Sequence, residues 1–483
     1  MTMLKNARFA ALAVALVTAQ CMFAQNLVSS EYLGDRSLSN LQAQFGPLIQ
    51  NGVKLYKLTY TTPDAFSQPD TASGLIAIPD RSGDWAYPLL CFQHGTVDSR
   101  SDVPSQLRGG YQAALVFGGM GYISIMPDFL GLGDARGFHP YVHAATEASV
   151  GVDMLRAAKA FVESLDNVEI NAEQQVFVCG YSQGGHAAMA LQRSLEHDYP
   201  DEFNLIASAP MSGPYSISGA MIDALSSEDE YFYPAYIPNT FLSYNYVYGL
   251  YDSIQQAFKE PYAGLMQQFF EEQMTLSQLN DTLINTLTAL VGGSKPKYMI
   301  QDSLFEAILN DPDHPVNVAL RANDVYDWTP QVPTRLYYCM NDDQVVYTNS
   351  VLADSVMNAN GAPDLHAIDV DPAADHGGCV QPAFIATILF FAPHQMISQI
   401  NATADPKWSQ IRIGPVPASD FIAVYDAPES TEAMVYYPDG KMADYTILET
   451  GTGQINLDRL PAGMYYLVLK KGTHMTVKPL VKR

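Results

Sequence analysis

Short apolar runs alternate with stretches of helical periodicity between residues 53 and 205. The runs that predict strands are residues 54–62, 74–79, 87–94, 122–128, 174–182 and 203–210. The first two read as a hairpin and the others as buried strands. Between them, residues 146–164 place apolar side chains on one helical face. Alternation of this kind is typical of βαβ units, so the pattern predicts an α/β fold, a mostly parallel sheet with helices on both faces.

The alternation stops near Gly213, and residues 214–330 become helical and rich in aromatic residues. Leucines recur there at helical spacings, at positions 276, 279, 283, 287 and 290. Strand-like runs return at residues 334–341 and 365–371, followed by a helix expected over 381–398. The pattern therefore predicts a helical cap inserted late in one α/β domain.

From residue 415 to residue 483 the pattern consists of short β-type segments. They follow a proline-containing junction and are residues 421–427, 433–441, 453–460, 464–472 and 475–482. We therefore expect a small all-β domain over 415–483, after an α/β domain over 25–414 that contains the cap.

The first 24 residues have the layout of a secretory signal peptide. Lys5 and Arg8 form a basic start, residues 9–17 form a short apolar stretch, and cleavage is expected before Gln25. No other stretch has 18 uninterrupted apolar residues, so no transmembrane span is expected in the mature chain. The sequence predicts an exported protein.

The chain is acidic, with 51 Asp and Glu against 26 Lys and Arg and a net charge of −25. Such a field repels nucleic acids and anionic membrane surfaces, so neither is expected as a partner. Signal cleavage leaves four cysteines, Cys91, Cys179, Cys339 and Cys379. Three lie in apolar runs, which favours buried free thiols over a disulfide framework, and their spacing suggests no metal site. We expect no metal and no cofactor.

The string "VFVCGYSQGGHAAMALQR" (176–193) places Ser182 between an apolar strand and a helical pattern. Gly180 and Gly184 flank the serine in a G-x-S-x-G pattern, where a sharp strand-to-helix turn exposes the serine Oγ. Because a serine hydroxyl is a poor nucleophile, it needs a base and an acid that orients the base. Ser182 is the predicted nucleophile.

The partners of such a serine follow it in the order acid, then histidine. Asp342 comes as a strand-like run ends, and the adjacent Asp343 is the alternative acid. His376 lies on a glycine-flanked loop after the next run, whereas His366 lies within a strand and His394 within a helix. Order and placement therefore favour Asp342 and His376.

Ester or amide cleavage also needs two backbone N–H groups that face the developing oxyanion. One is expected from Gln183, which directly follows the nucleophile at a helix start. The other is expected from Thr96 in "CFQHGT" (91–96), where Gly95 permits close approach.

These motifs resemble the α/β-hydrolase superfamily, and most of all its secreted lipases and esterases. The resemblance covers roughly residues 50–400 and rests on "FQHGT", "PDFLGLG", "GYSQGGHA", "NDDQVV" and "DHGGC". It implies an α/β-hydrolase fold, a triad of Ser182, Asp342 and His376, and an oxyanion hole of Thr96 and Gln183. Asp128 in "PDFLGLG" is expected to be structural.

The C-terminal segment is similar to the sorting domains of type IX secretion substrates. The similarity rests on residues 438–441 (Pro-Asp-Gly-Lys), "INLDRLPAGMYYL" and the basic end with Lys478, Lys482 and Arg483. It implies a β-sandwich that the outer-membrane secretion machinery recognises. The alternative is a carbohydrate-binding or spacer module.

The sequence thus predicts a secreted serine carboxylic ester hydrolase acting on a lipid or small-molecule ester. The alternatives are a serine peptidase or aminoacyl hydrolase, a carbohydrate-acyl (acetyl or feruloyl) esterase, and a binding module without activity. An intact Ser, Asp and His set argues against the last.

Overall fold

The computed structural model describes residues 26–400, 408, 410–471 and 474–483, so the expected signal peptide lies outside the described residues. Within this part of the chain, a central sheet of nine strands has the order β1-β2-β3-β6-β5-β8-β9-β10-β11. The strands β3 to β11 that surround the site are Pro69–Asp80 (β3), Ile123–Pro127 (β6), Leu89–Gln93 (β5), Gln175–Tyr181 (β8), Asn204–Met211 (β9), Thr334–Tyr338 (β10) and Leu365–Asp369 (β11).

The two edges of the central sheet differ. Strands β1 (Leu27–Arg36), β2 (Gly52–Pro63) and β3 pair antiparallel, and β2 with β3 is the expected hairpin. From β6 to β11 neighbouring strands run parallel. The carboxyl ends of the parallel strands therefore meet at one edge, where such sheets place their ligands.

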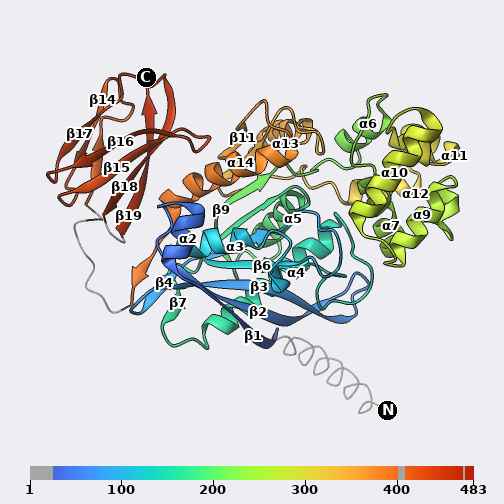
Figure 1. Ribbon diagram of the computed structural model, residues 1–483, viewed down its shortest axis with the longest axis horizontal. Helices are drawn as coiled ribbons and strands as arrows, with labels where there is room; N and C mark the ends of the chain where they lie inside the picture. The colour runs from blue at the N-terminus through green and yellow to red at the C-terminus, as the bar shows by residue number, and fades with distance from the viewer. Residues whose placement is uncertain (1–25, 401–407, 409, 472–473) are drawn as a thin grey trace, which may run out of the picture.

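Helices cover both faces of the sheet, as the alternating pattern predicts (Figure 1). Helices α4 (Ala144–Val162) and α5 (Gln183–His197) pack on one face. Helices α2 (Leu38–Phe45), α3 (Gln112–Gly119) and α14 (His376–Phe391) pack on the other. Each face carries its own apolar core, so this part is a three-layer α/β domain.

The insertion between β9 and β10 is helical and forms its own apolar core. Its elements are α6 (Ala220–Ser226), α7 (Tyr236–Tyr248), α8 (Ile254–Ala257), α9 (Tyr262–Phe270), α10 (Leu276–Val291), η2 (Pro296–Met299), α11 (Asp302–Asn310) and α12 (Pro315–Ala322). In α10 the first four periodic leucines are buried, whereas Leu290 is 60% exposed. Leu290 lies in the last turn before the Gly292 C-cap, where the stripe no longer faces the cap core.

The helix expected over 381–398 begins five residues earlier, at His376, and ends at Phe391 before the short η3 (Ala392–His394). It begins there because the Asp375 side chain accepts a hydrogen bond from Gly378 N and caps the first turn. The segment His376–His394 is also long and apolar enough to cross a membrane, by length and composition alone. Here it packs against the sheet on one side and the C-terminal domain on the other.

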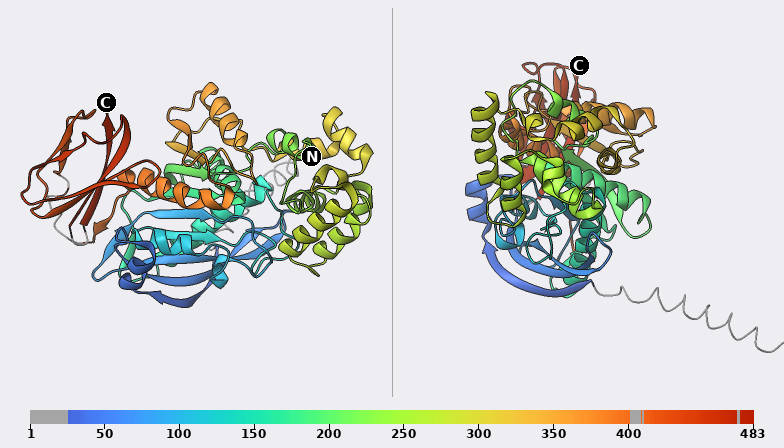
Figure 2. Two further views of the ribbon diagram at one scale, coloured as in Figure 1. Left: turned by 45° about the horizontal axis from the view of Figure 1, so that its top comes forward. Right: turned by 90° about the vertical axis from the view of Figure 1, so that its right-hand side faces the viewer.

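The C-terminal domain consists of antiparallel strands in two sheets, of order β13-β14-β17 and β16-β15-β18-β19, which enclose an apolar core. Their bounds are Arg412–Gly414 (β13), Phe421–Tyr425 (β14), Thr431–Tyr436 (β15), Met442–Leu448 (β16), Gly453–Asn456 (β17), Gly463–Lys471 (β18) and His474–Lys482 (β19). Figure 2 shows this domain and the cap at opposite ends of the molecule. The expected all-β domain is therefore present, and it lies away from the cap.

The remaining elements are small. Strands β12 (Ser398–Gln399), β4 (Trp85–Tyr87) and β7 (Val168–Ile170) form an edge sheet beside the central one. Helix α13 (Thr348–Ala359) connects β10 and β11, and η1 (Pro104–Gln106) precedes α3.

Candidate active site

Ser182 lies at the carboxyl end of β8, directly before the first residue of α5. Its backbone has φ 62° and ψ −124°, a conformation that non-glycine residues rarely adopt. A Cβ on Gly180 would collide with the carbonyl of Gly184, and a Cβ on Gly184 would collide with the carbonyl of Gln93. The flanking glycines are therefore required by the close approach of three backbone segments, which explains the G-x-S-x-G pattern.

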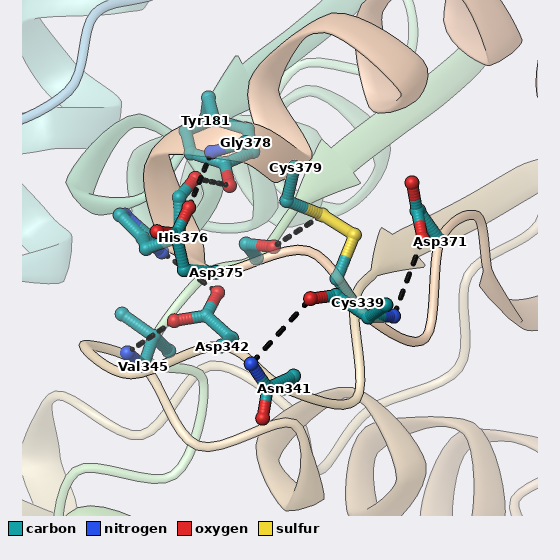
Figure 3. The surroundings of a disulfide bond; sticks show 12 residues. Tyr181, Cys339, Asn341, Asp342, Val345, Asp371, Asp375, His376, Gly378 and Cys379 are labelled. Carbon is teal, nitrogen blue, oxygen red and sulfur yellow. Dashed lines mark hydrogen bonds and ion pairs between the residues drawn. A yellow bond between two sulfur atoms is a disulfide. The ribbon is translucent and has the colours of Figure 1, made fainter.

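Asp342 comes from the loop after β10, whereas His376, expected on a loop, is the first residue of α14, which follows the neighbouring strand β11 (Figure 3). The His376 Nδ1 and Asp342 Oδ2 atoms are 2.7 Å apart, and both side chains are almost fully buried. The other Asp342 oxygen accepts hydrogen bonds from the backbone N–H groups of Gln344 and Val345, at 3.0 and 2.9 Å. These three contacts fix the carboxylate and, through it, the orientation of the imidazole.

The neighbouring carboxylate, Asp343, makes a different contact. Its Oδ1 accepts a hydrogen bond from the backbone N–H of His376 at 3.1 Å. Asp343 therefore supports the start of α14, while the imidazole ring contacts Asp342.

The expectation of free thiols is wrong for two of the four cysteines. Cys339 and Cys379 form a disulfide, with Cα atoms 5.9 Å apart, whereas Cys91 and Cys179 are free and buried. Cys339 follows β10 and Cys379 lies in the first turn of α14, so the fold brings together residues that are 40 positions apart. The disulfide links the loop that carries Asp342 to the helix that begins with His376 (Figure 3).

Ser182 is joined to this pair through the preceding residue. The Tyr181 hydroxyl donates a hydrogen bond to the His376 carbonyl at 2.6 Å, and the two rings are 5.0 Å apart. Among the described residues, no hydrogen bond joins Ser182 Oγ directly to the His376 ring. A reaction in which His376 takes the Ser182 proton therefore requires this contact to form.

Thr96 and Gln183, the expected oxyanion residues, both lie close to Ser182. A Cβ on Gly95 would lie 3.2 Å from the Tyr181 carbonyl and 3.7 Å from Ser182 Cβ, so the Thr96 loop passes close to the serine. The Thr96 hydroxyl is held by the Tyr141 hydroxyl at 2.8 Å. Gln183 is the first residue of α5, where the helix dipole favours negative charge.

An apolar cavity that opens to solvent lies between Ser182 and the cap. It is lined by Ser182 and Gln183, and on the cap side by aliphatic and aromatic residues that include Ile217, Met221, Leu225, Ile237, Phe241 and Leu320. Tyr231 and Tyr236 also line it, and their hydroxyls bond to Gln344 beside Asp342. Burial raises the pKa of both tyrosines, which keeps them neutral.

Sequence reasoning missed several residues around the site. Ile217 and Met221 carry no motif, and Leu320 lies about a hundred residues further along the chain, so only the packing of the cap identifies them. Asp128, in contrast, has the structural role expected of it, since its buried carboxylate accepts hydrogen bonds from Ser73 Oγ and Ser105 N. Burial raises the pKa of Asp128.

Comparison with known proteins supports this architecture. Residues 113–366, more than half of the chain, match the family described as "Secretory lipase", and residues 412–483 match the "Secretion system C-terminal sorting domain". No curated protein matches the sequence.

Several solved structures are similar to the chain. The cell wall degrading esterase LipA from Xanthomonas oryzae is 27% identical, with a TM-score of 0.66, over 75% of this chain and 95% of that one. A putative hydrolase from Legionella pneumophila is 26% identical, with a TM-score of 0.67, over 76% and 97%. Candida antarctica lipase A, at 15% identity, 76% and 80% coverage and a TM-score of 0.56, shares the fold. The fold is that of the α/β-hydrolases, with a helical cap and a C-terminal all-β domain.

Proposed function

The chain belongs to the secretory lipase family and is a carboxylic ester hydrolase of the serine type; on that premise, we propose that Ser182, His376 and Asp342 form its catalytic triad. The observation that carries the proposal is the 2.7 Å contact between His376 and Asp342 beside the strained turn of Ser182. A buried acid that orients an imidazole beside a serine hydroxyl at a substrate cavity is the arrangement that activates serine.

The reaction proceeds in two halves. Ser182 Oγ attacks the ester carbonyl carbon while His376 Nε2 accepts the hydroxyl proton, and the oxyanion is held by the backbone N–H groups of Thr96 and Gln183. His376 then gives the proton to the leaving alcohol, which yields an acyl-enzyme on Ser182. In the second half, a water loses a proton to His376 and attacks the acyl carbon. His376 then gives that proton to Ser182 Oγ as the acyl–oxygen bond breaks, which releases the carboxylic acid and free Ser182.

The cavity at Ser182 supports an apolar acyl group as substrate. Its lining residues include no charged side chain, which disfavours the peptidase and aminoacyl-hydrolase alternatives, because a substrate ammonium would have no counter-charge there. Each buried CH₂ is worth about 0.8 kcal/mol, so a medium acyl chain gains over acetate. Initial rates on 4-nitrophenyl esters from acetate to palmitate, beside aminoacyl-anilides, test this proposal.

A second cavity favours the carbohydrate-ester alternative as a variant of the same activity. It adjoins the first at Tyr141 and Gln183 and is lined by polar residues that include Asp98, Ser99, Arg100 and Gln278. A hydroxylated alcohol would fit it better than an alkyl one, and the similar LipA is a cell wall degrading esterase. Hydrolysis of acylated sugars, measured beside alkyl esters of the same acid, decides between the two alcohols.

The matched C-terminal sorting domain supports export to the cell surface or the medium. We propose that residues 1–24 direct passage across the inner membrane and that residues 415–483 engage the outer-membrane machinery. Deleting 415–483 should leave the enzyme in the periplasm of its native host, and unchanged export would contradict this.

A further inference from the structure

A second carboxylate–imidazole pair is buried between helices α4 and α5. Glu147 of α4 and His186 of α5 have their Oε2 and Nδ1 atoms 2.6 Å apart, and both side chains are at most 1% exposed. The remaining Glu147 oxygen accepts a hydrogen bond from the Gln183 side-chain amide at 3.1 Å. The triad does not use this pair, yet it touches the residue that follows Ser182.

His139 fixes the second hydrogen of the same amide. Its Nδ1 lies 2.8 Å from the Leu130 carbonyl, which can only accept, so Nδ1 donates and Nε2 is left to accept. Gln183 Nε2 lies 2.9 Å from that Nε2. Burial lowers the pKa of His139 to about 4, so the ring is neutral at neutral pH and can play this accepting part.

Both amide hydrogens of Gln183 are therefore used, one by Glu147 and one by His139. Turning the amide over would put its oxygen against Glu147 Oε1, so this acceptor oxygen selects the orientation. The amide oxygen that results is buried and has no hydrogen-bond partner among the described residues. An unpaired buried acceptor is costly, so the two donor contacts must outweigh its loss of hydration.

The pair is itself anchored. His186 Nε2 lies 2.8 Å from the Asn323 carbonyl and so must donate to it, while one proton is shared between Glu147 Oε2 and His186 Nδ1. The Asn323 side chain also accepts a hydrogen bond from Ala144 N at the start of α4. Glu147 is thus held by α5 and by the chain that leaves the cap, as well as by its own helix.

We propose that Glu147 is a positioning residue of the ester hydrolysis, which aims the Gln183 backbone N–H at the oxyanion by clamping the Gln183 side chain. This inference rests on the proposed function. Gln183 follows a residue in a strained conformation, so its N–H direction is sensitive to small rotations of the turn. A clamp between α4 and the loop that carries His139 restricts such rotations.

The test compares Glu147→Ala, Gln183→Ala and the double variant on a soluble ester. Gln183→Ala keeps the backbone N–H and removes the clamp, together with the part of the cavity wall that the Gln183 side chain forms. We expect each single variant to lower kcat by about 10- to 100-fold, less than the 10²–10³ lost with a whole oxyanion donor, with KM changed less than threefold. Because Glu147 acts through Gln183, the double variant should be no slower than the slower single one.

The conservative variant Glu147→Gln tests whether the hydrogen bond to Gln183, and not the carboxylate itself, sets kcat. Its amide oxygen can accept from Gln183 and its NH₂ can donate to His186 Nδ1, with His186 Nε2 still bound to Asn323. We therefore expect it to recover most of the kcat lost in Glu147→Ala. Affinity for a trifluoromethyl ketone, which forms a hemiketal oxyanion on Ser182, should fall in parallel with kcat across the series.

Asp153→Ala is the matched control, because Asp153 is a buried carboxylate on the same helix that bonds Asn26 and Arg156 away from the site. It should lower the unfolding temperature and leave kcat unchanged. Any one of three results would overturn the proposal. The first is a wild-type kcat in folded Glu147→Ala or in Gln183→Ala, and the second is a double variant whose loss of kcat equals the combined losses of the two single variants. The third is a Glu147→Gln variant that is as slow as Glu147→Ala. Should Glu147→Ala fail to fold, Gln183→Ala alone decides. A wild-type enzyme without esterase activity would instead refute the proposed function.

Discussion

The His376 ring contacts the carboxylate of Asp342, whereas the adjacent Asp343 contacts only the backbone N–H of the same histidine. Two neighbouring aspartates thus divide two tasks at the start of one helix. The division follows from the loop after β10, where the N–H groups of Gln344 and Val345 bind Asp342 and turn its carboxylate toward the imidazole.

This division predicts unequal effects of two matched substitutions. Asp342→Asn should lower kcat by about 10³- to 10⁴-fold, because an amide cannot hold the imidazole in the required tautomer. Asp343→Asn should stay within about tenfold of wild type, since an amide oxygen can still accept from the His376 N–H. Steady-state hydrolysis of a 4-nitrophenyl ester measures both. A larger loss for Asp343→Asn would reverse the assignment.

The Cys339–Cys379 disulfide should stabilise the protein as well as the site. It closes a loop of 40 residues, for which the chain-entropy model gives about 4 kcal/mol of unfolding free energy. We expect Cys339→Ala/Cys379→Ala to lose unfolding free energy of this order, measured by urea unfolding. A reductant should lower the unfolding free energy of the wild type and leave that of the double variant unchanged. Equal unfolding free energies for wild type with and without reductant would show that the disulfide contributes nothing.

His143 predicts a loss of stability in acid. Burial, followed by the charge of His186, lowers the pKa of His143 to about 4, below the ordinary value of 6.5. The unfolded chain therefore binds a proton between pH 6.5 and 4 that the folded chain does not, so this contribution is complete above pH 6.5 and lost as the pH falls.

The loss from His143 is up to about 3 kcal/mol over that interval. His143→Gln should flatten the dependence of the unfolding free energy on pH, while His366→Gln, which removes an exposed imidazole, should not. Parallel pH dependences for wild type and His143→Gln would exclude His143 as a cause.

The apolar cavity predicts which acyl chains are preferred. The value of kcat/KM should rise from acetyl to octanoyl esters, because the cavity beside Ser182 buries the added CH₂ groups. Ala224→Trp, which fills the cavity from α6, should abolish this rise and spare the acetyl ester. Asp223→Trp changes an exposed neighbour on the same helix and serves as the control. A wild-type preference for acetyl over octanoyl would indicate a small-acyl esterase.

Features that depend on local patterns could be predicted from the sequence. The alternation of strands and helices predicted the α/β layers, and the two glycines around Ser182 predicted the strand-to-helix turn. Both features depend on residues that are close together in the sequence. The start of α14 was placed too late, since the Asp375 cap was not recognised.

Features that depend on distant contacts could not be predicted. The Cys339–Cys379 disulfide and the Glu147–His186 pair join residues 40 and 39 positions apart, and no local spacing marks either. The choice between Asp342 and Asp343 also stayed open in the sequence, because it depends on how one loop turns its carboxylates.

The most direct test of the account is covalent labelling of the folded protein with a fluorophosphonate probe, followed by mass spectrometry of the peptide that contains Ser182. We predict one label per chain, on Ser182, lost on denaturation and absent from Ser182→Ala, which should fold normally and hydrolyse no ester. Labelling and ester turnover that persist in Ser182→Ala would contradict the central claim that this serine is the nucleophile.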